Sequence, residues 1–246
     1  MIHDGILFRL DNFEKWPNKA EDILQDGMWK DKECFIIGGG ESLKGFDFSK
    51  LDGKLTIGIN RSIEVYDSTL WYGMDWHFLK YVENGKVDQD KWNNYKGIKV
   101  FSMPEFDGIF HKDLYFAKRT HGGLVNQSLE QGIDPGTNSG YGAIMLAVAL
   151  GVKTIFLLGY DMTVVEKTHW HEGYPGQNFA DQKWRTERFA TSFEMTAGTI
   201  RGLGISVYNL SPISKLTCYP KVGLEAAFPT EAPVASGQSE FHDLYY

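Results

Sequence analysis

The stretch FIIGGGESL, which spans Phe35 to Leu43, carries an apolar strand directly into a turn made of three glycines. Its first three residues form the aromatic and β-branched run expected of a strand that is buried on both faces of a sheet. Gly38, Gly39 and Gly40 then let the backbone turn sharply and approach a ligand closely, because no Cβ stands in the way. The stretch therefore predicts a buried strand that ends in a ligand-binding turn.

Glu41 and Ser42 follow the glycines, where a helix or a 3₁₀ turn would begin. Free backbone N–H groups at such a start suit an anion. We therefore expect a nucleotide or phosphate to be bound by Gly38, Gly39, Gly40, Glu41 and Ser42. A strand-to-loop turn that binds no ligand is the alternative. The motif is not the dinucleotide GxGxxG, because Leu43 replaces the third glycine, and it is not a P-loop, because no Gly-Lys-Ser/Thr follows.

The composition describes an ordinary globular protein of 246 residues, of which 42% are hydrophobic and 23% are charged. A formal net charge of −7 argues against a generic nucleic-acid surface. Two distant cysteines, Cys34 and Cys218, are too few for a disulfide framework or a CxxC metal site and favour a reducing compartment. No apolar run reaches the roughly 18 residues of a membrane span, and no signal peptide is recognisable. A cytoplasmic location is expected, which means the host cytoplasm if the chain is phage-encoded.

Apolar runs of strand length alternate with longer helical runs along the chain. Further strands are expected at Lys54–Ile59, Thr69–Gly73, Ile98–Phe101, Thr154–Leu158 and Ser206–Leu210. Helices are expected at Lys19–Asp26, Asn138–Leu150 and Lys183–Gly202. This alternation predicts a single α/β domain of Rossmann-like type, with a mostly parallel sheet and helices on both faces. We expect residues 1–32 to be an N-terminal lead-in, 33–216 the nucleotide-binding domain and 217–246 a C-terminal tail.

Polar residues cluster where the expected strands end. Besides the glycine turn, these strand ends carry Asn60, Arg61, Asp75, Gly159, Tyr160, Asp161 and Ser211. In parallel sheets, ligands lie beyond the carboxyl ends of the strands, at the topological switch point. The expected nucleotide site therefore includes Asn60, Arg61, Gly159, Tyr160 and Ser211, together with Asn138 and Ser139 at a helix start.

Several of these segments resemble a known family. FIIGGGESLKGFDFSKL, TIGINRS, NSGYGAIMLAVALGVKTIFLLGYDM and SVYNLSPISKL are similar to segments of the bacterial CMP-sialic-acid sialyltransferases. The same skeleton resembles the archaeal 6-hydroxymethyl-dihydropterin pyrophosphokinase-like proteins, and Gly73-Met74-Asp75 looks more like that branch. Phage and prophage proteins that combine both sets with a His-Trp-His segment look most similar. The resemblance covers roughly residues 33–216 and implies nucleotide binding.

The His-Trp-His segment holds His169 and His171 in a polar stretch between Asp161 and the last long helix. The sialyltransferase resemblance implies that one of them, with His171 ahead of His169, is the general base on an acceptor hydroxyl. An imidazole titrates near neutrality and suits this task. Alternatively, the pair could bind a divalent cation with Asp161, Asp75 or Glu172, or the two histidines could be ordinary loop residues.

Two departures from the sialyltransferase pattern bear on the leaving group. Met162, Thr163 and Val164 stand where that family has tyrosines that donate to the departing phosphate. The glycine turn also has Gly39 and Glu41 where the family has Asn and Pro. Charge on the leaving group would then be stabilised by other groups. The candidates are Arg61, Lys167, Arg185 and a metal ion.

Several strand-end residues have two interpretations each. Asn60 could recognise a base or ribose, or close a turn. Asn138 and Ser139 could bind phosphate, cap the helix, or do both. Asp161 could act catalytically, bind metal together with Asp75, contact a ribose, or fix the loop by accepting backbone N–H groups. Ser211 and Ser214 could contact a ribose or base.

These features together predict a nucleotide-dependent transferase, with glycosyl transfer from a nucleotide-sugar donor as the favoured reaction. One alternative is metal-dependent, pyrophosphokinase-like transfer to a pterin-like hydroxyl. A second alternative is a nucleotide-binding protein without turnover. The expected cofactors are a nucleotide or nucleotide sugar, with Mg²⁺ or Mn²⁺ in the metal-dependent case. The expected partners are a small-molecule nucleotide donor and an unidentified acceptor, and a homo-oligomer remains open.

Overall fold

The chain folds around one seven-stranded sheet in which all neighbouring strands are parallel. The computed structural model describes residues 2–3, 6–7, 18–102, 113–163 and 179–229. In spatial order the strands are β7 (Leu114–Phe116), β6 (Ile98–Phe101), β5 (Leu70–Gly73), β4 (Leu55–Ile59), β3 (Glu33–Ile37), β8 (Thr154–Leu158) and β9 (Ser206–Asn209). A separate antiparallel pair joins β1 (Ile2–His3) to β2 (Ile6–Leu7).

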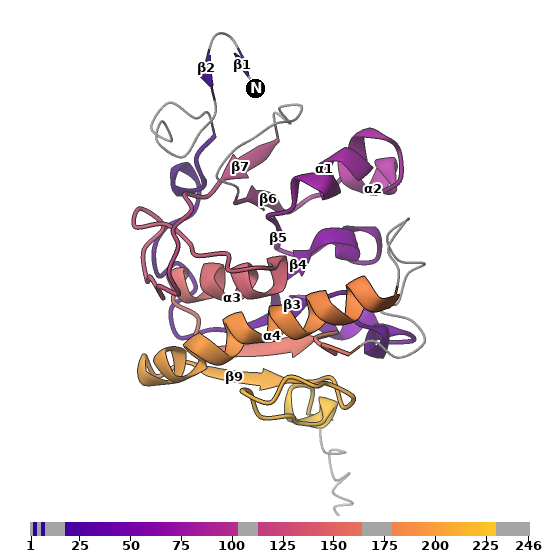
Figure 1. Ribbon diagram of the computed structural model, residues 1–246, viewed down its shortest axis with the longest axis vertical. Helices are drawn as coiled ribbons and strands as arrows, with labels where there is room; N and C mark the ends of the chain where they lie inside the picture. The colour runs from indigo at the N-terminus through magenta and orange to yellow at the C-terminus, as the bar shows by residue number, and fades with distance from the viewer. Residues whose placement is uncertain (1, 4–5, 8–17, 103–112, 164–178, 230–246) are drawn as a thin grey trace, which may run out of the picture.

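The strand order reverses between β3 and β8. The chain adds β4 to β7 on one side of β3 and then crosses back to place β8 and β9 on its other side. Ile36 pairs with Ile57 of β4 and with Leu157 of β8, so the glycine strand is central. All seven strands point the same way, and β8 and β9 end on the right in Figure 1. The topological switch point therefore lies just beyond Ile37, at the carboxyl ends of β3 and β8.

Two helices cover the sheet face that is turned toward the viewer in Figure 1. They are α3 (Ser139–Ala149), which is buried along its whole length, and α4 (Phe179–Gly202). Alternate strand residues such as Ile36, Ile57 and Tyr72 join these helices in the largest apolar cluster. Asn138 begins α3, because its side chain accepts the Tyr141 amide at 2.8 Å.

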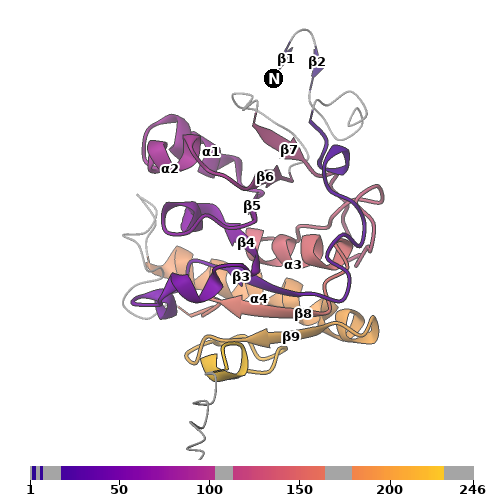
Figure 2. The same ribbon diagram turned by 180° about the vertical axis from the view of Figure 1, so that it is seen from behind.

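The opposite face, seen from behind in Figure 2, is covered by shorter elements. Trp71 and Phe101 pack there against α1 (Trp76–Glu83) and α2 (Gln89–Asn93). Phe35 and Phe156 pack against 3₁₀ turns and the C-terminal segment. These turns are η3 (Glu41–Leu43) and η4 (Phe48–Leu51), and η6 (Leu224–Ala226) lies just before Ala227 of the same cluster. The turn η5 (Asn60–Glu64) contributes Ile63 to the cluster of Trp71 instead. The expected single α/β domain with a parallel sheet between two layers is confirmed. No described helix is both long and apolar enough to cross a membrane.

The main differences from the predicted elements are at short segments. β7, α1 and α2 were not expected, and the helix predicted at Lys19–Asp26 is a single 3₁₀ turn, η2 (Ala20–Asp22). The other predicted strands and helices are present with bounds shifted by a few residues at most.

Described residues on the far side of both expected domain boundaries pack on the sheet. In the lead-in, Trp29 is buried and its amide donates to the Leu150 carbonyl at 2.8 Å. In the expected tail, Val222 donates its amide to the Asn209 carbonyl at 3.1 Å. Phe228 stacks on Phe35, with ring centroids 5.1 Å apart. Residues 18–32 and 217–229 are therefore parts of the same packed unit.

Candidate functional site

The glycine turn is fastened to the end of β8. The Gly38 amide donates to the Leu158 carbonyl at 2.7 Å, and the Gly40 amide donates to the Gly159 carbonyl at 2.8 Å. A Cβ on Gly38 would lie 2.7 Å from the Gly159 oxygen, and one on Gly40 would lie 2.5 Å from the Asp161 carboxyl carbon. The first and third glycines are therefore required by close packing against β8. Gly39, between them, is partly exposed and is the glycine that a ligand can reach.

Asp161, the last of the strand-end residues of β8, is buried and holds three loops together. Its carboxylate accepts the Ser42 amide at 2.9 Å, the Ser42 hydroxyl at 2.5 Å and the Ser211 hydroxyl at 2.5 Å. Only 3% of the residue is exposed. Of the roles expected for Asp161, this geometry matches the loop-fixing one, and it extends the same role to Ser211. We call Asp161, Ser42 and Ser211 the Asp161 clamp.

Tyr160 lies in the core, not at the mouth of a pocket. Its hydroxyl donates to the Gly140 carbonyl of α3 at 2.9 Å, and the residue is 2% exposed. Its backbone carbonyl accepts hydrogen bonds from the Ser214 hydroxyl at 2.6 Å and from the side-chain Nδ2 of Asn209 at 3.2 Å. The side chains of Tyr160 and Ser214 thus connect β8 to α3 and to the segment after β9, which places them in the scaffold around the expected site.

The start of α3 brings three predicted nucleotide-binding residues together. The Ser139 hydroxyl faces the Asn60 side-chain oxygen at 3.4 Å, a long hydrogen bond. Asn60 has a φ of 50°, in the left-handed region that asparagine tolerates, and it follows β4 directly. The Asn138 side-chain nitrogen is buried and has no hydrogen-bond partner among the described residues. Unsatisfied and weakly bonded amide groups therefore gather at the positive end of the α3 dipole.

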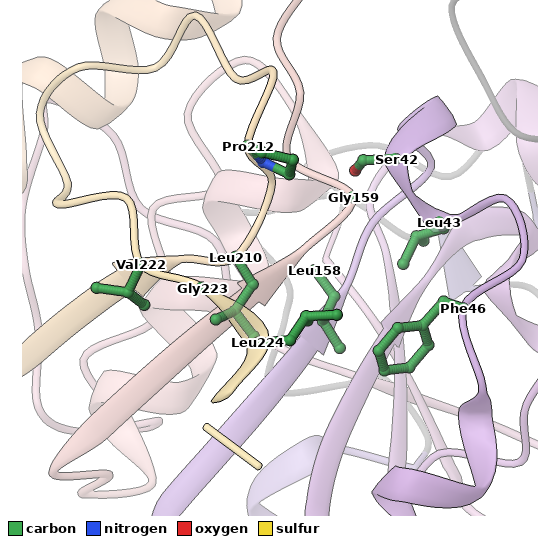
Figure 3. Close-up of a pocket in the computed structure, with 10 residues that line it drawn as sticks. All are labelled: Ser42, Leu43, Phe46, Leu158, Gly159, Leu210, Pro212, Val222, Gly223 and Leu224. Atoms are coloured by element: carbon green, nitrogen blue, oxygen red, sulfur yellow. The ribbon is translucent and has the colours of Figure 1, made fainter. Parts of the chain in front are cut away.

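A pocket of about 210 Å³ lies between the loops that follow β3, β8 and β9. Figure 3 shows its wall, which is mostly apolar and includes Leu43, Phe46, Leu158 and Leu210, with Ser42 at its edge. Its volume is below the roughly 300–1,000 Å³ of sites that enclose a whole drug-sized ligand. The pocket is therefore sized for one flat or apolar part of a larger ligand.

Arg61, another expected nucleotide contact, is already paired. Its Nε donates to the Glu64 carboxylate at 2.6 Å and its terminal nitrogen donates at 2.9 Å, in a two-point ion pair. Glu64 also accepts the Asp88 amide at 3.0 Å. Neutralising a leaving group would require Arg61 to break this pair, so the structure does not favour it for that role. Glu41 is partly exposed at the glycine turn, and its negative charge opposes a nearby phosphate.

The structure does not bring the two candidate metal ligands together. Asp75 ends β5 and Asp161 ends β8, and the strands β4 and β3 lie between them. Three strand spacings of about 4.8 Å separate their backbones by about 14 Å, whereas carboxylate oxygens bind Mg²⁺ or Ca²⁺ at about 2.0–2.6 Å. Asp75 instead caps α1 by accepting the His77 amide at 2.9 Å. In the described ranges no three His, Cys, Asp or Glu residues form a metal-binding group. This arrangement does not favour one cation shared by Asp75 and Asp161, and the metal site stays a prediction.

A second polar cluster, which sequence reasoning missed, lies where β5, β6 and β7 end. Its members are Tyr72, Ser102 and Arg119, with Asp134 nearby. Burial raises the pKa of the Tyr72 hydroxyl, and its neighbours Ser102 and Arg119 oppose part of that rise. Burial also lowers the pKa of the Arg119 guanidinium. Ser102 directly follows a correctly predicted strand, so applying the strand-end rule there would have found it.

Lys167, His169, His171 and Glu172 lie outside the described residues, so their expected roles stay predictions. Arg185 belongs to α4, and its side chain lies outside the described part of that helix.

Comparison with solved structures finds a likeness to sialyltransferases. The sialyltransferase CstII from Campylobacter jejuni, in complex with cytidine-5'-monophosphate, aligns with a TM-score of 0.49 and 17% identity over 79% of this chain and 86% of that chain. CstII with a trisaccharide acceptor and CMP gives 0.49 and 16% over 78% and 86%. The monofunctional α-2,3-sialyltransferase Cst-I from the same organism gives 0.49 and 17% over 81% and 80%. No protein-family model and no curated protein matches the chain. A likeness of this extent leaves the function to be inferred from the site itself.

Proposed function

We propose that this protein is a nucleotide-dependent transferase that uses a nucleotide-sugar donor, in the manner of a glycosyltransferase. The observation that carries the proposal is the convergence of three features at one switch point. The glycine turn, Asn60 and the start of α3 meet at the carboxyl ends of adjacent parallel strands. Such crevices are where open α/β sheets bind nucleotides.

The groups free at this edge suit a phosphate. Among the described residues, the amides of Gly39 and Glu41 make no hydrogen bond, in contrast to those of Gly38, Gly40 and Ser42. A phosphate at the start of α3 would accept hydrogen bonds from such amides and gain from the helix dipole. In this arrangement Ser139 donates to the phosphate and Asn60 contacts the ribose or base.

The proposed general base is His171, with His169 as the second candidate. Both follow β8, whose carboxyl end lies at the switch point, and loops of this kind commonly carry functional residues. Removing a proton from the acceptor hydroxyl is worth on the order of 10²- to 10⁴-fold in rate. We expect His171→Ala to lower kcat with little change in donor affinity, and to remove the acidic limb of the pH–rate profile.

His121→Ala is the matched control for the base, because His121 is an exposed histidine of the described chain. Normal turnover in both His171→Ala and His169→Ala would exclude a histidine base.

Nucleotide binding is tested first by a thermal-shift screen of nucleotides and nucleotide sugars, in EDTA and with Mg²⁺ or Mn²⁺. A ligand at 100 times its Kd adds about 2.7 kcal/mol of stability, which raises the Tm by several degrees. Turnover that needs a divalent cation would favour the pyrophosphokinase-like alternative. Binding without any turnover would indicate the non-catalytic alternative.

Two substitutions test whether the nucleotide binds at the switch point. Gly39→Val should abolish nucleotide binding while the protein stays folded, because the side chain would fill ligand space. Ser139→Ala should weaken binding by about tenfold or more, as expected for the loss of a hydrogen bond to a charged group.

The controls for these substitutions lie away from the proposed nucleotide site. Gly198→Val changes an exposed glycine of α4 that has no neighbouring atom within 4 Å of a Cβ position. Ser206→Ala changes a serine at the opposite end of the strands. Unchanged nucleotide affinity in folded Gly39→Val and Ser139→Ala proteins would refute the proposed site.

A further inference from the structure

Arg119 is a partly buried cation that forms no ion pair with a carboxylate of the described residues. It follows β7, and its backbone is held by the strand-like pairing of its neighbours with Ile133, at 2.7 Å from Lys118 and 2.9 Å from Thr120. The Nε atom of Arg119 is buried without a hydrogen-bond partner, and no ion pair involves Arg119 among the described residues. A buried donor without an acceptor is unfavourable, so a positive group of this kind calls for a bound anion.

Asp134 is the carboxylate that interacts electrostatically with Arg119, but it is already engaged. One of its oxygens accepts the Gly123 amide at 2.7 Å and the other accepts the Gly136 amide at 2.8 Å. Asp134 thereby fixes the loop that leads to α3. Among the described residues the Nε–H of Arg119 has no acceptor, so this donor is left for another group.

Two hydroxyls accompany Arg119 on the same face of the sheet. Tyr72 pairs with Val100 in the sheet register, and Ser102 lies two residues beyond Val100, so both side chains point to the α3 face. The two residues are fully buried, and neither hydroxyl has a hydrogen-bond partner of acceptable geometry among the described residues. Tyr72 also interacts electrostatically with Arg119. Three unsatisfied polar groups thus meet at the ends of β5, β6 and β7.

This cluster lies beside the proposed nucleotide site. A Cβ on Gly142 would be 2.4 Å from the Tyr72 hydroxyl, so the Tyr72 ring lies against the first turn of α3. Gly142 is three residues, or about 5 Å along the helix axis, from Ser139. A ligand that begins at Ser139 and Asn60 needs to extend by only about one helical turn to reach Tyr72, which interacts electrostatically with Arg119.

We propose that Arg119, Tyr72 and Ser102 form an anion subsite that takes a carboxylate or phosphate group of the substrate beyond the nucleotide. The guanidinium supplies a planar pair of donors, which match the two oxygens of such a group, and each hydroxyl supplies one more donor. The proposal deepens the proposed function, on which its substrate assignment rests. It specifies that the transferred sugar or the acceptor carries a second acidic group.

The direct test is the side-chain Nε–Hε NMR resonance of Arg119 in the full chain. The resonance is assigned by its absence in Arg119→Gln and followed during additions of sodium phosphate or sodium acetate at constant ionic strength. We expect a saturable shift, with the Arg201 resonance as an internal control, because Arg201 is exposed on α4. The anion that binds more tightly identifies the phosphate or the carboxylate. An unsaturable shift no larger than that of Arg201 with both anions would overturn the proposal.

Two variants separate a specific subsite from a general positive charge. Tyr72→Phe should weaken anion affinity by about tenfold or more without unfolding the protein, because only an unpartnered hydroxyl is lost. Arg119→Lys keeps the charge but loses the planar fork, and it should weaken binding as well. Unchanged anion affinity in both variants would also overturn the proposal.

Failure of the anion subsite can be distinguished from failure of the proposed function. Ser139→Ala should leave the Arg119 titration intact, because the two sites use different donors. Saturable binding at Arg119 without any nucleotide ligand would refute the proposed function and keep the subsite. Nucleotide binding without saturable anion binding at Arg119 would keep the proposed function and refute the subsite.

Discussion

Two polar clusters lie along the same edge of the sheet, and they differ in how their hydrogen-bonding groups are satisfied. The Asp161 clamp at the ends of β3, β8 and β9 pairs each of its side-chain oxygens with a nearby donor or acceptor. The cluster of Tyr72, Ser102 and Arg119 at the ends of β5, β6 and β7 leaves three buried polar atoms without partners in the described chain. Because both clusters are largely buried, burial alone does not distinguish them. Satisfied groups indicate a scaffold, whereas unsatisfied groups indicate a place for a ligand.

The largest effect is expected at the Asp161 clamp. Asp161→Ala removes the acceptor of three hydrogen bonds, those of the partly buried Ser42 amide and hydroxyl and of the buried Ser211 hydroxyl. At about 1–3 kcal/mol for each unsatisfied group, we expect a loss of about 4 kcal/mol in the free energy of unfolding. Urea denaturation monitored by circular dichroism measures it.

Asp47→Ala is the matched control, because Asp47 also accepts both the amide and the hydroxyl of one serine, Ser49, but in an exposed position. We expect a much smaller loss for it. Equal losses in the two variants would show that the burial of the clamp contributes nothing.

A smaller effect is expected from Gly40→Ala. The added Cβ would lie within 2.6 Å of both the Asp161 carboxylate and the Gly159 carbonyl, so the glycine turn must move away from β8. We expect a loss of about 2–3 kcal/mol in the free energy of unfolding, as for other overpacked sites.

Gly198→Ala, on the exposed side of α4, provides the comparison. It meets no atom within 4 Å and should stabilise the protein by about 0.5–1 kcal/mol, because alanine favours a helix. A Gly40→Ala protein as stable as the parent would mean that the turn is not held against β8.

The smallest effect compares a satisfied buried tyrosine of the scaffold, Tyr160, with the unsatisfied Tyr72 of the second cluster. Tyr160→Phe removes a hydroxyl that donates to Gly140 at 2.9 Å and should lower the free energy of unfolding by about 1 kcal/mol. Tyr72→Phe removes a hydroxyl without a partner in the described chain and should leave stability unchanged or raise it by up to about 1 kcal/mol. Thermal and urea unfolding of both variants test this difference. A Tyr72→Phe protein destabilised as much as Tyr160→Phe would show that the Tyr72 hydroxyl is satisfied in the ligand-free protein.

The central strands were predictable because short apolar runs, such as Phe35–Ile37 and Ile155–Leu158, stop at a glycine. The weaker elements were not. β7 contains only three residues, and the sequence around it has no strand periodicity. The sequence does not reveal α1, because its capping residue, Asp75, also fits the pattern of a metal ligand at a strand end. A carboxylate after a strand has the same local sequence in both roles, and only the next turn of chain distinguishes them.

At the candidate site, the sequence located the residues better than it defined their roles. The strand-end rule gathered Gly40, Ser42, Asp161 and Ser211, which do lie together. Their hydrogen bonds run between segments up to 119 residues apart, so no local pattern could show that they bind one another. The same holds for Arg119, whose position depends on the pairing of its neighbours with Ile133.

The sequence by itself determined that this protein is a parallel α/β domain with a glycine turn at the end of its central strand. Apolar runs and glycines act locally, through the burial of side chains and the freedom of the backbone, so they can be recognised without coordinates. Only the tertiary structure decided which strand-end groups are hydrogen-bonded within the protein and which are left for a ligand. Satisfaction of a buried donor depends on atoms contributed by distant segments, and this separates the Asp161 clamp from Arg119, whose Nε has no partner among the described residues.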